Sequence, residues 1–186
     1  MRQSIISFLL IITAIYLFGC SEDKVQPSVN STFKNKELPT QESWNSTVFF
    51  TDSGKTKAVL ISGHLRMFTM ARETLLDSNI RVNFFNPLEV QTTVLTSKRG
   101  RVDDVTQNLY AMDSVVVVND SGVTITTQEL MWRNKDRKIV SDRFVTIVSP
   151  NERIEGYGFE SDQSLRNYVI YKITYITTKE NLNTSK

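Results

Sequence analysis

The sequence has few of the residues that build catalytic and metal centres. Its 186 residues include one cysteine and one histidine, which excludes an intramolecular disulfide framework and a cluster of metal-binding histidines. The formal net charge is only +2, which argues against a nucleic-acid binder that works by neutralising phosphates. No glycine-rich loop has the spacing of a phosphate cradle. Nothing in the sequence favours an enzyme, and no cofactor is implied.

The remaining candidates for chemistry are isolated. His64 has no partners in the sequence that suggest a triad, so a solvent-facing or structural role is expected. The adjacent Asp103 and Asp104 would point to opposite faces of a strand, which makes them a poor acid–base pair. The basic cluster "KRGR" at 98–101 is either a solvated turn or a contact for the phosphate groups of an anionic lipid.

The single cysteine, Cys20, stands just behind an apolar run. Residues 5–18 form that run, which is shorter than the roughly 20 residues of a membrane-spanning helix but has the length of a signal-peptide core. The following "LFGC" resembles the bacterial lipobox, in which the cysteine thiol takes a diacylglyceryl group. We therefore expect a lipoprotein signal peptide at 1–19 and lipid attachment at Cys20. A plain membrane anchor with an incidental cysteine is the alternative.

The mature chain divides into three parts by composition. Residues 20–43 are polar, include two prolines and are predicted to form a disordered tether behind the lipidated cysteine. A folded domain is expected at 44–176. The polar end at 177–186 is predicted to be a flexible tail.

The domain has the composition of β-strands. Segments rich in Val, Ile, Thr and aromatic residues are separated by turn signals at 52–54, 86–87, 119–122 and 149–151. The segment 66–76 has a weak helical period, but a strand would continue the surrounding pattern and is favoured. The sequence therefore predicts an all-β domain.

A faint internal repeat runs through the domain. Residues 95–118 align with 125–148 at a shift of about 30, so that Leu95 matches Ile125 and Leu109 matches Ile139. Residues 154–170 resemble a third, shortened copy. Stacked units of this kind bury a continuous apolar face that a single unit cannot bury.

Several strands carry apolar residues that alternate with a period of two. The candidates for an inward-facing, lipid-binding surface are Val82, Phe84, Val116, Val118, Phe144 and Val148. Because "SVVVVN" is apolar on both faces, the sequence does not decide which face is inward. The apolar surroundings that cover the second face are either a packed protein core or an apolar ligand.

A series of motifs along 44–170 resembles the LptC family of lipopolysaccharide export proteins, which are related to LptA and OstA-like domains. The motifs are "LTS..G", "G..I.T..L.W", "I.SD..V.I" and "G.GF.SD", in that order. The resemblance implies a twisted antiparallel β-jelly-roll with an apolar interior groove. It also implies a relay that accepts lipopolysaccharide from the inner-membrane ABC transporter and passes it to an LptA-like periplasmic protein.

The resemblance implies a location at the periplasmic face of the inner membrane. Well-known family members carry an N-terminal transmembrane helix, whereas this chain has a lipobox, so contacts made by that helix are not carried over. In some bacteria a serine after the lipidated cysteine favours outer-membrane sorting, and Ser21 leaves that destination open. An anchored β-scaffold that binds protein partners without lipid is the alternative function. A relay would keep an unfilled groove, and a scaffold would fill it with side chains.

The last predicted strand, 166–178, has the composition of an edge strand. It contains no proline, and Lys172 is its only central charge. We expect Tyr168, Ile170 and Ile173 to lie on an edge that pairs with the LptA-like partner. The alternative is that this strand only closes the core.

Overall fold

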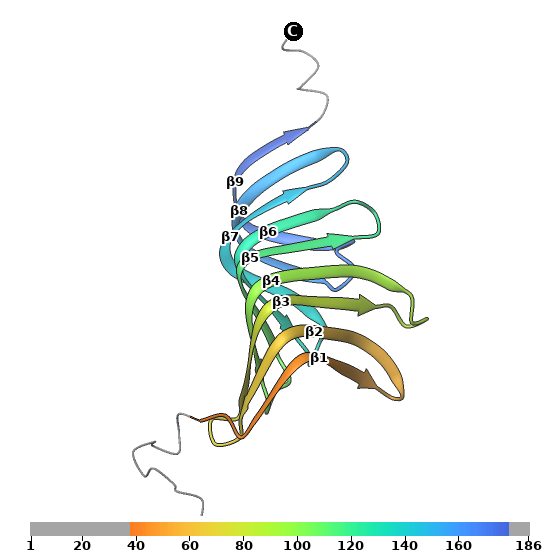
Figure 1. The fold of residues 1–186 in the computed structure, drawn as a ribbon. Helices are drawn as coiled ribbons and strands as arrows, with labels where there is room; N and C mark the ends of the chain where they lie inside the picture. Colours follow the sequence, from red (N-terminus) through yellow and green to blue (C-terminus); the bar gives the residue numbers. More distant parts are fainter. Residues whose placement is uncertain (1–37, 179–186) are drawn as a thin grey trace, which may run out of the picture. The chain divides into compact units, whose positions relative to one another are not determined.

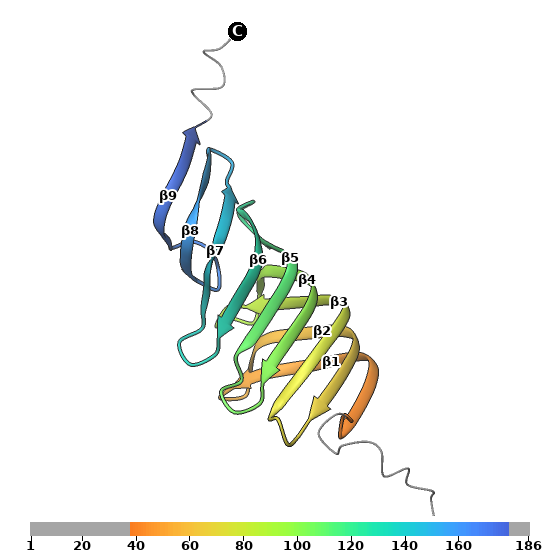
Figure 2. The ribbon, with the colours of Figure 1, turned by 90° about the vertical axis from the view of Figure 1, so that its left-hand side faces the viewer.

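The structure, a computed structural model, describes residues 38–178, and these form one antiparallel sheet. Its strands are β1 (Gln41–Asp52), β2 (Lys55–Phe68), β3 (Glu73–Phe85), β4 (Gln91–Asp103), β5 (Leu109–Asn119), β6 (Thr124–Arg133), β7 (Lys138–Val148), β8 (Glu152–Asp162) and β9 (Tyr168–Thr178). Each strand pairs with its neighbours in sequence, so β1 and β9 are the two edges (Figures 1 and 2). The all-β prediction is confirmed.

Parts of the predicted organisation fall outside the described residues. These are the signal peptide, Cys20, most of the tether and nearly all of the tail. Within 38–178 no segment forms a helix that could span a membrane. The segment 66–76 is extended, as favoured, but it contains a turn that the sequence analysis missed, because β2 ends at Phe68 and β3 begins at Glu73.

The sheet is bent along a line that crosses the middle of its strands. From β2 to β8, every pair of neighbouring strands shifts register once near mid-strand. Bulges of this kind leave residues unpaired and bend a strand sharply. The bulges lie side by side, so the sheet folds into two facing walls, and Figure 1 shows the strands bending together.

A row of buried hydroxyl groups follows the bend. Ser62, Ser97 and Thr127 occupy equivalent places on β2, β4 and β6, and each donates to a backbone carbonyl beside a bulge. The distances are 2.8 Å from Ser62 Oγ to His64 O, 3.1 Å from Ser97 Oγ to Arg99 O and 2.9 Å from Thr127 Oγ1 to Phe144 O. The hydroxyls thereby donate to backbone carbonyls next to the places where the ladder is interrupted.

The core lies between the two walls. Trp132 of β6 packs edge-on against Phe50 of β1, with ring centroids 5.4 Å apart, and lies 5.5 Å from the ring of Phe84 of β3. Phe50 and Phe84 belong to one wall and Trp132 to the other, so the contact joins the walls of a jelly-roll-like fold. The matched apolar positions of the predicted repeat are fully buried, as the repeat requires: Leu95, Leu109, Ile125 and Ile139.

The strand ends form two rims, one on each wall. The first rim consists of the turns at 53–54, 86–90, 120–123 and 149–151 with the strand residues that flank them. The second rim consists of the turns at 69–72, 104–108, 134–137 and 163–167. In a straight 11-residue strand the two ends would lie about 36 Å apart. The bend brings the two rims close enough to touch.

The hydroxyl row predicts a specific loss of stability in Thr127→Val. This change keeps the side-chain shape but removes the hydroxyl that donates to Phe144 O in a buried place, at a cost of about 1–2 kcal/mol, while Glu129 O keeps its donor from Ser141 Oγ. Urea unfolding should show the difference. Thr126→Val is the matched control, because Thr126 is exposed on the other face, and we expect it to change stability by less than about 0.5 kcal/mol. Equal midpoints for the two variants would mean that the hydroxyl does not hold the bend.

Candidate functional site

Two of the predicted interior residues lie in the interior. Val82 and Phe84 are on the inward face of β3 and are completely buried. Val82 pairs with Leu60 and Leu95 on the flanking strands, and both of these are also buried. The lipid-binding role of Val82 and Phe84 stays a prediction.

The other four predicted interior residues lie on the outer face. Val116, Val118, Phe144 and Val148 are partly or substantially exposed, and the inward positions belong to their neighbours Val115, Val117, Val145 and Ile147. The predicted inward placement is therefore wrong for β5 and β7. Both faces of these strands are apolar, so the alternation did not distinguish them.

The interior is filled by side chains in this structure. Trp132, Phe84 and Phe159 are the largest of the residues that are fully buried there. Trp132 Nε1 has no hydrogen-bond partner among the described residues, although it is buried. An unpaired buried donor of this kind costs about 1–3 kcal/mol. A filled interior is the feature that we expected of a scaffold rather than of an open groove.

The opening between the two rims is called the mouth of the bent sheet. Polar contacts between the rims close it. The Arg137 guanidinium of the second rim forms an ion pair with Asp52 of the first rim. Gln163 Nε2 donates to the backbone carbonyl of Phe85 at 2.9 Å. Since the ion pair is about half exposed, it contributes roughly 0–1 kcal/mol. Such contacts hold the mouth weakly compared with the core beneath it.

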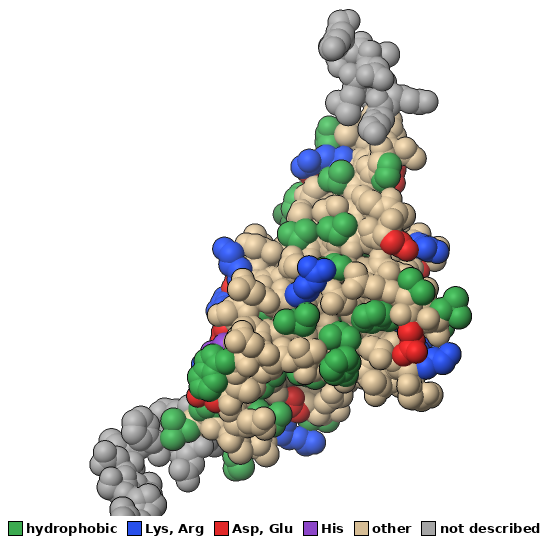
Figure 3. Space-filling view, turned by 45° about the vertical axis from the view of Figure 1, so that its right-hand side comes forward, with side chains coloured by type: hydrophobic (Ala, Val, Ile, Leu, Met, Phe, Trp, Pro, Cys, Tyr) green, Lys and Arg blue, Asp and Glu red, His purple; other side chains and the backbone are tan. Residues whose placement is uncertain are grey.

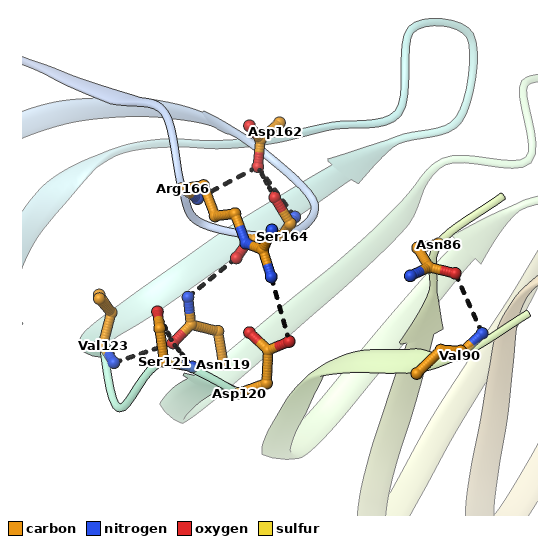
Figure 4. Close-up of polar contacts among 9 residues, drawn as sticks. All are labelled: Asn86, Val90, Asn119, Asp120, Ser121, Val123, Asp162, Ser164 and Arg166. Carbon is orange, nitrogen blue, oxygen red and sulfur yellow. Dashed lines mark hydrogen bonds and ion pairs between the residues drawn. The ribbon is translucent and has the colours of Figure 1, made fainter. Parts of the chain in front are cut away.

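The turn between β8 and β9 makes the most extensive contact across the mouth (Figure 4). Asn119 Nδ2 donates to the carbonyl of Ser164 at 2.9 Å, and Arg166 pairs with Asp120 at 3.3 Å. The Oδ1 atom of Asn119 accepts from the backbone N–H of Val123 at 2.9 Å, which fixes its own turn. Asn119 therefore joins the two rims.

Asn86 occupies a similar place in the neighbouring turn of the first rim. Its Oδ1 accepts from the backbone N–H of Leu88 at 2.9 Å and from that of Val90 at 3.1 Å. Figure 4 shows the bond from Val90. These hydrogen bonds stay within the β3–β4 turn. Asn86 and Asn119 thus share a turn-fixing role, and only the bond from Asn119 to Ser164 reaches the second rim.

Asp162 fixes the β8–β9 turn from its own side. Partial burial raises the pKa of its carboxyl, but hydrogen bonds from Ser164 Oγ, Asn167 Nδ2 and the backbone N–H of Arg166 outweigh burial and leave the pKa below its usual value. The carboxylate therefore stabilises the turn in its charged form.

The C-terminal edge of the sheet is open. Within the described chain β9 pairs only with β8. Tyr168 and Ile170 pack against the core, whereas Ile173 is 54% exposed. In Figure 3, hydrophobic side chains reach the surface towards this end of the stack. The edge position expected for Tyr168, Ile170 and Ile173 is where the structure places them; partner binding there stays a prediction.

Two glycines, Gly156 and Gly158, let β9 approach β8 closely. A Cβ on Gly156 would lie 2.4 Å from the carbonyl oxygen of Lys172. Gly158 has a φ of +74° and packs beneath the ring of Tyr171. The register between β8 and β9 shifts between Glu155 and Gly156, which marks a bulge or irregularity there.

At the opposite edge of the sheet, two residues of β1 contact the single histidine, His64. His64 Nε2 lies 2.6 Å from Glu42 Oε1, and the imidazole stacks on the exposed Trp44 ring at a centroid distance of 5.3 Å. Both partners belong to β1 and His64 belongs to β2. The structural role expected of His64 is to fasten the first strand to the second.

The basic cluster at 98–101 is largely engaged by the protein itself. Arg99 forms an ion pair with Asp113 on the next strand. Arg101 lies 3.8 Å from Glu73 and 4.2 Å above the ring of Tyr110. Lys98 remains exposed at the bend. The described residues contain no group of three or more His, Cys, Asp or Glu side chains that could hold a metal ion.

The comparisons with known proteins agree with the fold. A family model described as "Lipopolysaccharide-assembly, LptC-related" matches residues 5–177, which is nearly the whole chain. The chain belongs to the LptC family. A comparison with curated proteins found no match. Membership of the LptC family places the chain in lipopolysaccharide transport, on the periplasmic side of the inner membrane, with other proteins of that transport system as its partners.

The lowered pKa of Asp162 predicts a pH-dependent loosening of the β8–β9 turn. The stabilisation is fully present above the ordinary aspartate pKa of about 3.9 and is lost as the pH falls through the lower pKa of the folded state. Backbone NMR signals of residues 164–167, followed from pH 6 to pH 2, should report this loss. Asp162→Asn keeps an acceptor oxygen but does not titrate, so its turn should lose the transition. The same transition in both proteins would assign it to another group.

Proposed function

We propose that this LptC-family chain is a membrane-anchored relay. It accepts lipopolysaccharide from the inner-membrane ABC transporter and passes it to an LptA-like periplasmic protein. The observation that carries the proposal is the bent sheet, whose two apolar walls face each other and end at an unpaired, apolar edge strand. The family match supports the same assignment.

The walls supply what the acyl chains of lipopolysaccharide need. Each methylene exposed to water costs roughly 0.8 kcal/mol, so a lipid with several acyl chains requires a continuous apolar path across the periplasm. The inward faces form a run from β2 to β8 that includes Val82, Phe84 and Val117. Acyl chains that enter between the walls would contact these residues.

The edge strand supplies a way to extend the path. A strand of the LptA-like partner that pairs with β9 would continue the sheet and align the two interiors. Ile173 and Ile176 face the interior side of β9 opposite Gly156 and Ile154, and both are more than half exposed. A partner's sheet would bury them. The single central charge of Lys172 is a modest barrier to pairing between two copies of this chain.

Anchoring is part of the proposal. Lipidation at Cys20 would hold the domain at the periplasmic face of the inner membrane, where the transporter releases lipid. An acyl anchor with more than one chain is stable in a bilayer. The tether ahead of β1 then sets how far the first strand can reach.

The filled interior favours a second candidate, an anchored β-scaffold that binds protein partners without lipid. In this structure the side chains between the two walls already form a packed core. The two candidates differ in whether lipid ever contacts the inward faces.

Photocrosslinking separates them. Val117 and Val118 are adjacent on β5, but Val117 is inward and completely buried whereas Val118 is 40% exposed on the outer face. The relay predicts that a photoreactive residue at 117 labels lipopolysaccharide in cells at least about tenfold more than one at 118, because only the inward face meets acyl chains. Immunoblotting of the adducts measures this ratio. Equal labelling, or none at either position, would support the scaffold.

The proposed edge contact predicts the effect of removing most of β9. A chain truncated after Ile170 keeps Tyr168 and Ile170, which pack against the core, and loses the exposed part of the strand. We expect a folded protein whose co-purification with the LptA-like partner falls at least about tenfold, with binding to the transporter retained. Trp44→Ala at the opposite edge is the control and should leave capture of the LptA-like partner unchanged. Wild-type capture by the truncated chain would show that β9 is not the binding edge.

A further inference from the structure

The fourth turn of the second rim differs from the three before it. Each of these turns contains one non-glycine residue with a positive φ of 55–58°: Arg72, Gln107, Arg137 and Leu165. The first three are exposed polar residues. Leu165 is 1% exposed and belongs to the core. The β8–β9 turn alone therefore inserts a side chain between the walls.

A leucine is poorly suited to this backbone conformation. A positive φ is uncommon for residues other than glycine, asparagine and aspartate, and a bulky side chain in that region needs support from its surroundings. The support here comes from burial and from the polar contacts that hold the turn to the first rim. These are Asn119 Nδ2 to Ser164 O, Gln163 Nε2 to Phe85 O, and the Arg166–Asp120 pair.

The place that the turn covers is part of the inward surface of the first wall. Phe85 follows the buried Phe84, and Thr93 pairs in register with both Phe84 and Asn119. Thr93 Oγ1 and Gln163 Oε1 are buried without hydrogen-bond partners in the described part of the chain. The turn thus closes the mouth with incomplete hydrogen bonding, and it leads directly into the edge strand β9.

We propose that the β8–β9 turn is a gate and that Leu165 occupies a subsite for an acyl chain. The inference rests on the proposed lipid-relay function. In the closed state the Leu165 side chain is buried in the same apolar core cluster as Phe84. A saturated acyl chain is the ligand class that fits a site vacated by a branched alkyl group and lined by apolar side chains. Entry of that chain displaces the turn and breaks the bond from Asn119 to Ser164.

The gate joins two events that a relay must coordinate. The turn runs from Asp162 at the end of β8 to Tyr168 at the start of β9. Displacement of Leu165 therefore moves the beginning of the edge strand that is proposed to meet the partner. Lipid arrival in the interior and exposure of the edge become linked through five turn residues, 163–167.

Two variants test the gate in the full-length chain with purified lipopolysaccharide as the probe. Asn119→Asp keeps the acceptor oxygen that fixes its own turn but replaces the donor to Ser164 with a second acceptor. Leu165→Gly removes the plug and accepts the positive φ without strain. Asn86→Asp is the matched control, since Asn86 fixes the equivalent turn without crossing the mouth.

We expect lipopolysaccharide to associate about fivefold faster with Asn119→Asp and with Leu165→Gly than with wild type. A change of this size corresponds to the loss of one neutral hydrogen bond. Amide exchange of residues 163–167 without lipid should rise similarly. Asn86→Asp should match wild type in both measurements. Circular dichroism verifies folding, and if Leu165→Gly does not fold, Asn119→Asp decides.

The outcomes separate the gate from the relay. If wild type binds lipid and both gate variants bind at the wild-type rate, the gate is wrong and the relay stands. If Asn86→Asp accelerates binding equally, any loosened rim has the same effect and the gate is again wrong. If no variant and no wild-type protein binds lipid, the relay is wrong and the gate falls with it.

Discussion

The fold depends on the line of bulges that crosses the sheet. Without it, nine antiparallel strands would form an open sheet with one uncovered apolar face, and Trp132 could not reach Phe50 and Phe84. At the bend, the buried hydroxyls of Ser62, Ser97 and Thr127 donate to backbone carbonyls beside the bulges. One local device, repeated strand after strand, therefore creates both walls of the proposed lipid path and brings their rims together.

The same packing that stabilises the domain opposes its proposed function. Acyl chains and core side chains compete for one space, so a relay must separate its walls or move a side chain out. The contacts across the mouth are few and polar. The bend, in contrast, contains a register shift in every strand pair from β2 to β8. The weakest part of the closed structure therefore lies at the mouth, next to the edge strand, where lipid transfer to a partner requires movement.

Much of the fold could be predicted from sequence, and the failures have physical causes. The first-rim turns contain Gly, Pro or Asn signals such as Asn86 and Gly122, and all four were predicted. The second-rim turns contain no glycine or proline and use residues such as Arg72 and Leu165 at positive φ, so they were missed. The inward face of β5 and β7 could not be chosen from the sequence, because apolar residues line both sides of these strands, and the candidates Val116, Val118, Phe144 and Val148 lie on the outer face. The repeat was found because buried positions keep their spacing. Contacts across the mouth join distant segments and left no sequence signal.

The most direct test of lipid between the walls needs no mutation. The chain has two tryptophans, Trp132 in the closed interior and Trp44 exposed on β1. Their indole N–H groups give separate signals in a ¹⁵N NMR spectrum of the protein. The account predicts that bound lipopolysaccharide shifts the Trp132 signal and leaves the Trp44 signal in place. A bound complex in which the Trp132 signal does not move would contradict it.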